Sequence, residues 1–542
     1  MADEPWWRGA VIYQIYPRSF FDSDGDGTGD LPGVTAKLDY VANLGVDGIW
    51  LSPFFRSPMK DFGYDVCDYC DVDPTLGTLA DFDALLARAH ELGLKVVIDQ
   101  VYSHTSNEHP WFAESSRSAD NAKADWYVWA DAKPDGTPPN NWQSNFGGPA
   151  WTWHPRRRRY YLNNFLSEQP DLNFHNPEVR EALLKVAAFW LDRGVDGFRL
   201  DVANYYFHDP KLRDNPPAPF TRTPHRTYLF QRHIHDKSQP ENLDFVADLR
   251  RLTDGYPDKM MVGEIGDDDA LARQREYTDG PDRLHTAYSF HLLETRHATP
   301  ELFISALEAW RGAMGWPSWS LGNHDVPRFP TRFGGDDPPP ARIDGLLAAL
   351  FALRGTIFVY QGDELGLPQA HVPFEQMKDP YAMRAYVGDA GRDGARTPMP
   401  WSDTAPMAGF TTAKATWLPI DPAHPPLAPT VQARDPASHL ALTRRLVALR
   451  RAHPALRIGE VEPLEAPTSV LALTRIAGDE RVLCVINLGP EPAVFRHPAL
   501  AGGAVLETGL RAVLVGDSLE LPAFGAAYVL ARPVAAIEQT DA

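Results

Sequence analysis

The chain has 542 residues, 44% of them hydrophobic and 11% aromatic, so it can form more than one globular unit around a sizeable core. There are 52 basic and 72 acidic side chains, which gives a formal net charge of −20 at pH 7. This balance argues against nucleic acid and anionic membranes as partners, because both bind basic surfaces. The 15 tryptophans suit a ring-bearing ligand such as a carbohydrate.

Cysteine content and the start of the chain bear on the cellular compartment. The three cysteines, Cys67, Cys70 and Cys484, are too few for a disulfide framework. The N-terminal stretch MADEPWWRGAVIYQIY has no basic region followed by an apolar run, and no segment is apolar for long enough to span a membrane. We therefore expect a cytoplasmic protein without a membrane segment, either a monomer or a homodimer.

Strand-like and helix-like segments alternate from the beginning of the chain. Residues 11–17 are rich in β-branched and aromatic side chains and predict a strand, which leads through an Asp/Gly-rich loop to a helix over 34–44. A short apolar strand is expected at 46–54. An amphipathic helix at 79–92 follows it, and the next strand lies at 94–101.

The same alternation continues further along the chain. Asn176 and Pro177 form a cap and a first-turn proline that open a helix, and Gly194 ends it. Further strands are expected at 195–202, 260–265, 284–292, 318–323 and 356–362. Eight strands that alternate with helices predict an α/β fold, a (β/α)₈ TIM barrel.

Two stretches interrupt this rhythm, and a third ends it. Residues 105–172, after the third strand, are rich in Trp, Asn, Gly and Pro and predict an inserted subdomain. Residues 363–432 form a second long, Pro-rich stretch. Beyond residue 456 the segments VLALTRIA, RVLCVINLG, AVLVG and AAYVLARPV predict an antiparallel β domain. The expected domains are the barrel (1–104 and 173–455), the inserted subdomain (105–172) and the C-terminal β domain (456–542).

The loop after the first strand, FDSDGDGTGD, has the spacing of a cation site. Hard cations such as Ca²⁺ or Mg²⁺ prefer oxygen ligands, and glycines permit the tight turns around them. An EF-hand is excluded because Gly33 stands where that loop requires a glutamate. The alternative is an Asp/Gly-rich turn without metal, but clustered carboxylates repel one another. The expected ligands of a structural Ca²⁺ or Mg²⁺ are the carboxylates and one backbone carbonyl of Asp22, Asp24, Asp26, Thr28 and Asp30.

Polar residues end or follow most of the predicted barrel strands. In a (β/α)₈ barrel the carboxyl ends of the strands meet at one mouth, where the chemistry takes place. Asp201, Glu264 and Asp325 would bring three carboxylates there, with Arg199 two residues before the first of them, where it would lower that carboxyl's pKa. Paired carboxylates beside a guanidinium are what glycoside hydrolysis requires, since one must stay ionised while the other carries a proton. A single such residue could be an ordinary polar strand end, but burying so many charges without function would cost stability.

Several motifs carry a family resemblance. DQVYSHTS, GFRLDVAN, GEI and LGNHD, in this order, resemble the four signature regions of glycoside hydrolase family 13, the α-amylase family. QPDLN, at residues 169–173, resembles the fifth region of its oligo-1,6-glucosidase and α-glucosidase branch. DSDGDGTGD, DFGYDV, YQGDELG and GRDGARTPMPW resemble the same branch, so the resemblance covers nearly the whole chain.

This resemblance implies the function of a retaining exo-acting α-glucosidase that acts on short α-glucosides and also transfers glucose. It implies that Asp201 is the nucleophile, Glu264 the general acid and base, and Asp325 the stabiliser of the transition state. Arg199 would orient Asp201, and the two reacting carboxyl groups would lie about 5–5.5 Å apart. The remaining implied substrate-binding residues grip, stack on or wall off the terminal glucose: Asp61, Tyr64, His104, Phe165, Gln169, His324 and Arg392.

The sequence leaves linkage preference and some alternatives open. Val202, after the nucleophile position, is similar to α-1,6-cleaving members, whereas the segment from Ala203 to Pro224 resembles bacterial α-glucosidases for short substrates. A sucrose isomerase or trehalose synthase shares these motifs, although isomaltulose-forming isomerases typically have arginine at the position of Val202. A non-catalytic relative would have lost the carboxylates. A metal-dependent barrel hydrolase would need closely spaced histidine ligands, and His104 and His324 are far apart.

Overall fold

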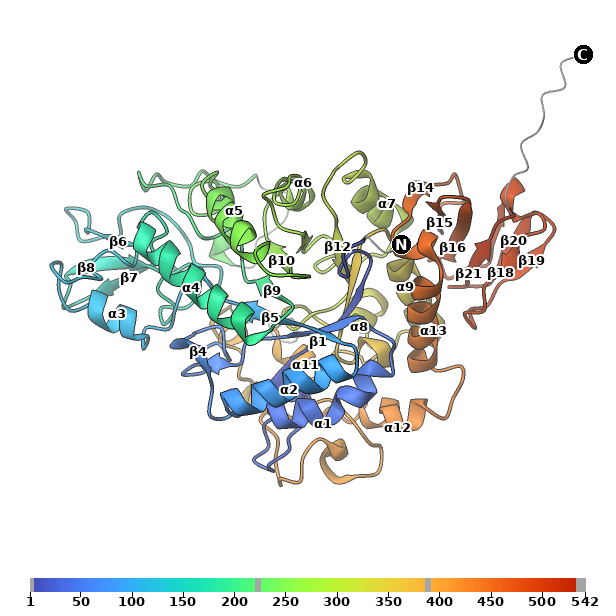
Figure 1. Cartoon of the computed structure of the whole chain (residues 1–542), viewed down its shortest axis with the longest axis horizontal. Helices are drawn as coiled ribbons and strands as arrows, with labels where there is room; N and C mark the ends of the chain where they lie inside the picture. The colour runs from blue at the N-terminus through green and yellow to red at the C-terminus, as the bar shows by residue number, and fades with distance from the viewer. Residues whose placement is uncertain (1–3, 220–225, 386–390, 533–542) are drawn as a thin grey trace, which may run out of the picture.

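The centre of the protein is a barrel of parallel strands. The computed structural model describes residues 4–219, 226–385 and 391–532. Hydrogen-bonded neighbours in the barrel follow the order β11-β10-β9-β5-β2-β1-β13-β12, and a bridge between Ala287 and Pro317 joins its two ends. The strands are β1 Val11–Ile15, β2 Gly48–Leu51, β5 Lys95–Gln100, β9 Gly197–Leu200, β10 Met260–Ile265, β11 Thr286–Ser289, β12 Ser318–Ser320 and β13 Thr356–Tyr360. The predicted (β/α)₈ barrel is confirmed (Figure 1).

The helices at 79–91 and 177–193 begin and end within one residue of the predicted positions, whereas the first helix, at 31–42, begins three residues before the predicted 34–44. Asn176 caps α4 by accepting a hydrogen bond from the backbone N–H of Glu178, and Gly194 ends the helix with a left-handed φ of 105°. Thr78 and Asp81 form a capping box at the start of α2. The helices around the barrel are α1 Leu31–Ala42, α2 Leu79–Glu91, α4 Pro177–Arg193, α5 Asn242–Thr253, α6 Ala270–Glu276, α7 Pro300–Glu308, α8 Phe329–Gly334 and α9 Pro340–Ala352.

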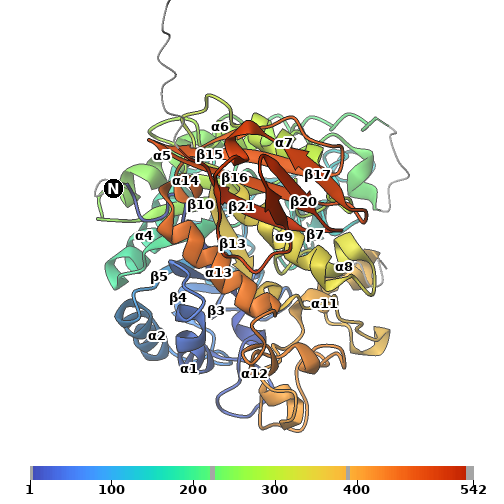
Figure 2. The ribbon, with the colours of Figure 1, turned by 90° about the vertical axis from the view of Figure 1, so that its right-hand side faces the viewer.

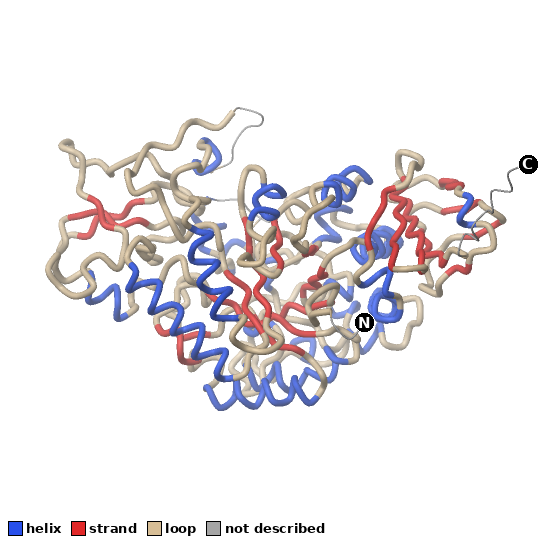
Figure 3. Tube along the Cα trace, turned by 45° about the horizontal axis from the view of Figure 1, so that its top comes forward, coloured by secondary structure: helices blue, strands red, loops and turns tan. Residues whose placement is uncertain are grey.

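The insertion after β5 contains a small sheet of its own. Strands β6 Trp129–Ala130, β7 Trp151–His154 and β8 Arg159–Leu162 pair in the order β6-β8-β7, beside helix α3 Pro110–Ser115. A short hairpin, β3 Phe55–Arg56 and β4 Asp68–Val72, follows β2. The inserted sheet lies at one end of the long axis of the molecule and the C-terminal sheets lie at the other, with the barrel between them (Figures 1 and 3).

The chain after β13 runs through short helices into the C-terminal domain. These helices are α10 Pro380–Ala385, α11 Asp393–Arg396, α12 Pro429–Gln432, α13 His439–Ala452 and α14 Pro454–Arg457. Four of the C-terminal strands overlap the predicted segments: β15 Val470–Ala477, β16 Glu480–Asn487, β19 Val513–Val515 and β21 Ala526–Leu530. The sequence missed the short strands β14 Glu460–Pro463, β17 Ala493–Arg496, β18 Ala504–Val505 and β20 Ser518–Leu521. Together they form a five-stranded and a three-stranded antiparallel sheet (Figure 2).

Two buried arginines join the C-terminal part of the chain to the barrel. Arg475 of β15 and Arg450 of α13 donate hydrogen bonds to backbone carbonyls at the end of α9, Arg475 to Ala352 and Leu353 and Arg450 to Phe351 and Leu353. Carbonyls at a helix C-terminus lack intrahelical partners, so cations there satisfy them and favour the helix dipole. The β domain is therefore fastened to the barrel through helix α9.

Two features of the structure bear on the expected cellular compartment. Within the described ranges, no helix combines the length and apolar character needed to cross a membrane. Cys67, Cys70 and Cys484 are all free thiols.

Candidate active site

One buried guanidinium connects the central carboxylates of the barrel mouth. Nη1 of Arg199 donates to Oδ1 of Asp201 at 2.6 Å and to both oxygens of Asp99 at 2.8 and 3.0 Å, while Nη2 donates to Oε2 of Glu264 at 2.6 Å. The register of the sheet places Asp99 beside Arg199 and Glu264 beside Tyr288. Two carboxyl groups from strands β9 and β10 are thus held on one rigid fork, as the order of strand ends predicted.

Asp325 contacts a second group of side chains, two arginines and a histidine. Its Oδ1 accepts a hydrogen bond from Nη2 of Arg396 at 2.8 Å, and Nη1 of Arg392 lies 3.6 Å from the same oxygen. Its Oδ2 lies 3.1 Å from Nε2 of His324. The side chain of Asp325 is 22% exposed, compared with 9% for Asp201 and 5% for Glu264, so it is the most open of the three carboxylates.

The other predicted substrate-binding residues form one contiguous network. Arg392 pairs with Asp61 at 2.7 Å, and the amide of Gln169 donates to Oδ2 of Asp61 at 3.2 Å and lies 3.1 Å from Nε2 of His104. The ring of Tyr64 stacks on His324 with an interplanar angle of 3°. Phe165 packs on His104, with ring centroids 5.3 Å apart. The structure therefore brings together every substrate-binding residue that the sequence proposed.

Burial and neighbouring charges separate the proton affinities of the carboxyl groups. Burial raises the pKa of Glu264 to about 8 and that of Asp201 to about 7, although Arg199 lowers both. For Asp325, burial also raises the pKa, but His324 and the guanidiniums of Arg396 and Arg392 outweigh it and bring the pKa well below its usual range.

The pKa of Asp201 corrects one expectation about Arg199. The arginine was expected to hold the pKa of Asp201 low, but burial and the nearby charges of Asp99 and Asp325 outweigh it. Burial thus raises the pKa of both carboxyl groups that share Arg199, and they titrate as one pair.

The family of the chain follows from a comparison with known proteins. A family model described as alpha amylase, catalytic domain, matches residues 14–459. The chain belongs to the alpha-amylase family. A "Probable alpha-glucosidase" of Rhizobium meliloti (strain 1021) is 51% identical over 536 aligned residues, and the match covers 97% of this chain and 97% of that protein.

Solved structures of similar proteins cover the whole fold. The crystal structure of the alpha-glucosyl transfer enzyme XgtA matches with a TM-score of 0.94 and 50% identity, over 98% of this chain and 100% of that one. The trehalulose synthase MutB from Pseudomonas mesoacidophila MX-45 matches with a TM-score of 0.87 and 33% identity, over 98% and 100%. Members of the alpha-amylase family with different named reactions thus share this architecture.

Three neighbours of the site in this alpha-amylase family member were not proposed from the sequence. The hydroxyl of Tyr288 accepts hydrogen bonds from Nη2 and Nε of Arg199 at 2.8 and 3.2 Å. Asp379 pairs with Arg392 at 2.7 Å, and Arg396 holds Asp325. Tyr288 and Arg396 lie in segments that the sequence had marked, a strand and the motif GRDGARTPMPW, whereas Asp379 carried no signal.

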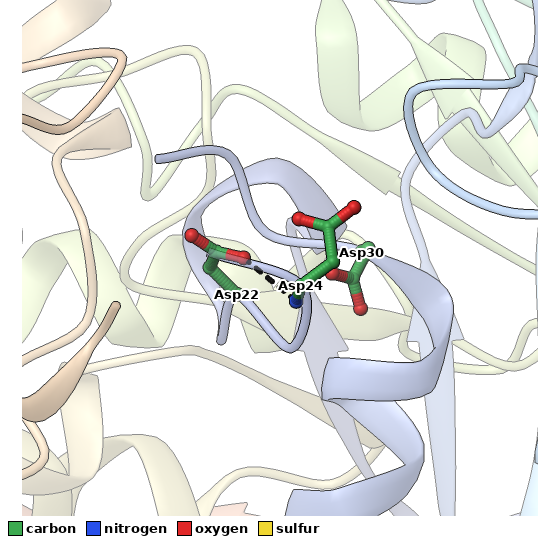
Figure 4. A group of neighbouring side chains, drawn as sticks. All are labelled: Asp22, Asp24 and Asp30. Carbon is green, nitrogen blue, oxygen red and sulfur yellow. Dashed lines mark hydrogen bonds between the residues drawn. The ribbon is translucent and has the colours of Figure 1, made fainter. Parts of the chain in front are cut away.

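The Asp-rich loop lies between β1 and α1 and brings three of its aspartates together. Asp22, Asp24 and Asp30 each have a carboxylate oxygen within 4.8 Å of the others (Figure 4). Asp22 accepts hydrogen bonds from the backbone N–H groups of Asp24, Gly25 and Gly27, and Asp30 caps α1.

Asp26 and Thr28 lie in the same loop and remain predicted ligands. The exposed carboxylate of Asp26 accepts a hydrogen bond from the backbone N–H of Thr28 at 2.7 Å and lies outside the group of three. Asp22 and Asp24 accept backbone N–H groups of the loop in the same way, so this hydrogen bond does not set Asp26 apart from them. The donor set fits a hard cation, because carboxylate oxygens that lie within 4.8 Å of one another repel unless a cation lies between them.

Proposed function

We propose that the protein is a retaining, exo-acting α-glucosidase that releases the terminal non-reducing glucose of short α-glucosides and also transfers it to acceptor sugars. The observation that carries this proposal is the guanidinium of Arg199, which binds Asp201 and Glu264 at 2.6 Å each and so fixes two carboxyl groups of different proton affinity side by side. The similarity to an alpha-glucosidase and to an alpha-glucosyl transfer enzyme supports it.

In the first step Asp201 attacks the anomeric carbon. Oδ1 of Asp201 is bound by Arg199, so Oδ2, which accepts no hydrogen bond from the described residues, is the attacking oxygen. Glu264 gives its proton to the glycosidic oxygen as that bond breaks, and a β-glucosyl ester of Asp201 forms. Asp325, kept ionised by its cations, binds the sugar hydroxyls and stabilises positive charge on the ring.

In the second step Glu264 acts as the base. It takes a proton from water, whose oxygen attacks the anomeric carbon and displaces Asp201, so glucose leaves with its original α configuration. An acceptor hydroxyl in place of water gives a transfer product. Asp61, His104, Gln169, His324 and Arg392 supply the polar contacts to the terminal glucose, with Tyr64 and Phe165 as its aromatic neighbours.

Product analysis tests this function. We expect glucose in its α form in the first seconds of reaction with maltose or isomaltose, followed by ¹H NMR before mutarotation. The substrate that is hydrolysed faster shows whether the enzyme prefers α-1,4 linkages, as in maltose, or α-1,6 linkages, as in isomaltose. The specific alternative is a sucrose isomerase, which the similarity to a trehalulose synthase favours. Isomerised disaccharide from sucrose without free glucose would replace the proposed hydrolase by this alternative.

We also propose that the carboxylates of Asp22, Asp24, Asp26 and Asp30, with the backbone carbonyl of Thr28, hold a structural Ca²⁺ or Mg²⁺ away from the sugar. After treatment with a chelator, added Ca²⁺ or Mg²⁺ is expected to raise the melting temperature by several degrees and to leave the rate at 25 °C nearly unchanged, since a ligand of the folded state stabilises it by mass action. Asp24→Ala should abolish this shift, and Asp282→Ala, at an exposed position outside the loop, should retain it. A loss of activity without a change in melting temperature would contradict the structural role.

Two further expectations accompany the proposed function. The free thiols of Cys67, Cys70 and Cys484 support a reducing, cytoplasmic location. The protein is expected to be a monomer or a homodimer, which light scattering on the purified protein distinguishes.

A further inference from the structure

The residue after the proposed nucleophile has an unusual backbone conformation. Val202 has a φ of 35°, in the left-handed region. Among the described residues it is the only β-branched one with a positive φ. Its branched Cβ makes this conformation costly, and strain of this kind persists only where the surroundings enforce it.

The left-handed turn directs a backbone N–H at the proposed acid. The N–H of Val202 donates to Oε2 of Glu264 at 3.1 Å, and the next N–H, of Ala203, donates to the backbone carbonyl of Glu264 at 3.0 Å. The turn that follows Asp201 is thus fastened to strand β10 at two points.

We infer that Val202 is a positioning residue whose strained backbone amide, together with Arg199, fixes Oε2 of Glu264 and leaves Oε1 as the oxygen that exchanges the proton with substrate. Oε2 accepts two hydrogen bonds, from Nη2 of Arg199 and from the N–H of Val202. An oxygen occupied by two donors cannot itself carry a proton directed at a third group, and Oε1 accepts no hydrogen bond from the described residues. This inference rests on the proposed function, because it assigns geometry to the acid of that reaction.

The contact between Val202 and Glu264 bears on the pH dependence of the reaction. The charged and titratable groups that face Glu264 are Arg199 and Asp201 from β9 and its end, Asp99 from β5, Asp325 after β12 and Tyr288 from β11. The amide of Val202 adds a hydrogen bond that favours the ionised carboxylate and lowers its pKa. Removing that N–H alone should therefore raise the pKa of Glu264, and with it the pH above which Glu264 no longer carries the proton of the general acid.

An amide-to-ester replacement tests this step. Valine 202 is replaced by its α-hydroxy acid analogue, which keeps the side chain and substitutes an ester oxygen for the N–H. The matched control is the same replacement at Ala203, whose N–H binds the backbone carbonyl of Glu264 and not its carboxylate. We expect the alkaline limb of kcat/KM to move upward by about 0.5–1 pH unit for the ester at 202 and to stay in place for the ester at 203. No movement at 202, or equal movement at both positions, would overturn the inference.

A second measurement does not depend on the folding of the ester variants. In protein labelled with ¹⁵N-valine, the amide signal of Val202, assigned by its absence from Val202→Ala, should shift with pH over the alkaline limb of activity. This titration should vanish in Glu264→Gln. An amide that does not titrate in the wild type overturns the inference. The proposed function is tested by a different result: if Glu264→Gln retains its activity, Glu264 is not the general acid, whatever the Val202 amide does.

Discussion

Asp201→Ala is expected to reduce the turnover of maltose by about 10⁵-fold, the scale at which an enzyme loses its nucleophile. Without Oδ2 of Asp201, no glucosyl ester forms. The fold should persist, because Arg199 keeps Asp99, Glu264 and Tyr288 as partners and one buried carboxylate of a crowded group is removed. Steady-state kinetics and thermal unfolding of the purified variant measure both effects.

Covalent trapping gives this prediction a second readout. Wild-type protein incubated with 5-fluoro-α-glucosyl fluoride should gain the mass of one fluoroglucosyl group on the peptide that contains Asp201, and Asp201→Ala should gain none. Asp282→Ala, on the exposed surface, is the control for handling and should behave as wild type. Near-normal activity of Asp201→Ala, or label on another peptide, would show that the nucleophile has been assigned wrongly.

Glu264→Gln is expected to lower the turnover of maltose by at least about 10³-fold, because both proton transfers are lost. An aryl glucoside with a good leaving group needs little acid assistance, so its glucosyl ester should form and then accumulate. Added azide should restore turnover of this substrate, since an anionic nucleophile needs no base. Burst kinetics with p-nitrophenyl α-glucoside measure the accumulation.

The same variant should change the pH dependence in a defined direction. Burial raises the pKa of Glu264 from 4.5 to about 8, so the folded state binds this proton more tightly than the unfolded state does. As pH rises from about 4.5 to about 8, ionisation of the buried Glu264 carboxyl therefore lowers the free energy of unfolding progressively. Glutamine does not ionise, so the variant avoids this loss. Glu264→Gln should unfold at a higher temperature than wild type at pH 8 and at a similar temperature at pH 4.5.

Activity of the wild type should follow a bell-shaped curve with its maximum between the two pKa values of the pair, about 7 and about 8. Protonation of Asp201 causes the acidic limb, and ionisation of Glu264 causes the alkaline limb. Glu460→Gln, on an exposed position of β14, is the control and should alter neither limb. An alkaline limb that survives in Glu264→Gln would place the general acid elsewhere.

Features that depend on neighbours along the chain could be predicted from the sequence. Strand β10 lies where its apolar run predicted, and helix α4 begins after the cap Asn176 and ends at Gly194, because caps, prolines and side-chain periodicity act within a few residues. The order of strands and motifs was also enough to place the carboxylates at one mouth, since parallel strands in a barrel all end at the same rim.

The tertiary structure alone decided what depends on groups far apart in the sequence. Tyr288 supports Arg199 from 89 residues away, and burial, which no local pattern reveals, overrides Arg199 and raises the pKa of Asp201. Val202 keeps its strained φ because its N–H is hydrogen-bonded to Glu264 of strand β10. Spacing along a chain fixes which residues can meet, whereas desolvation, strain and hydrogen-bond partners arise only when distant strands close around them.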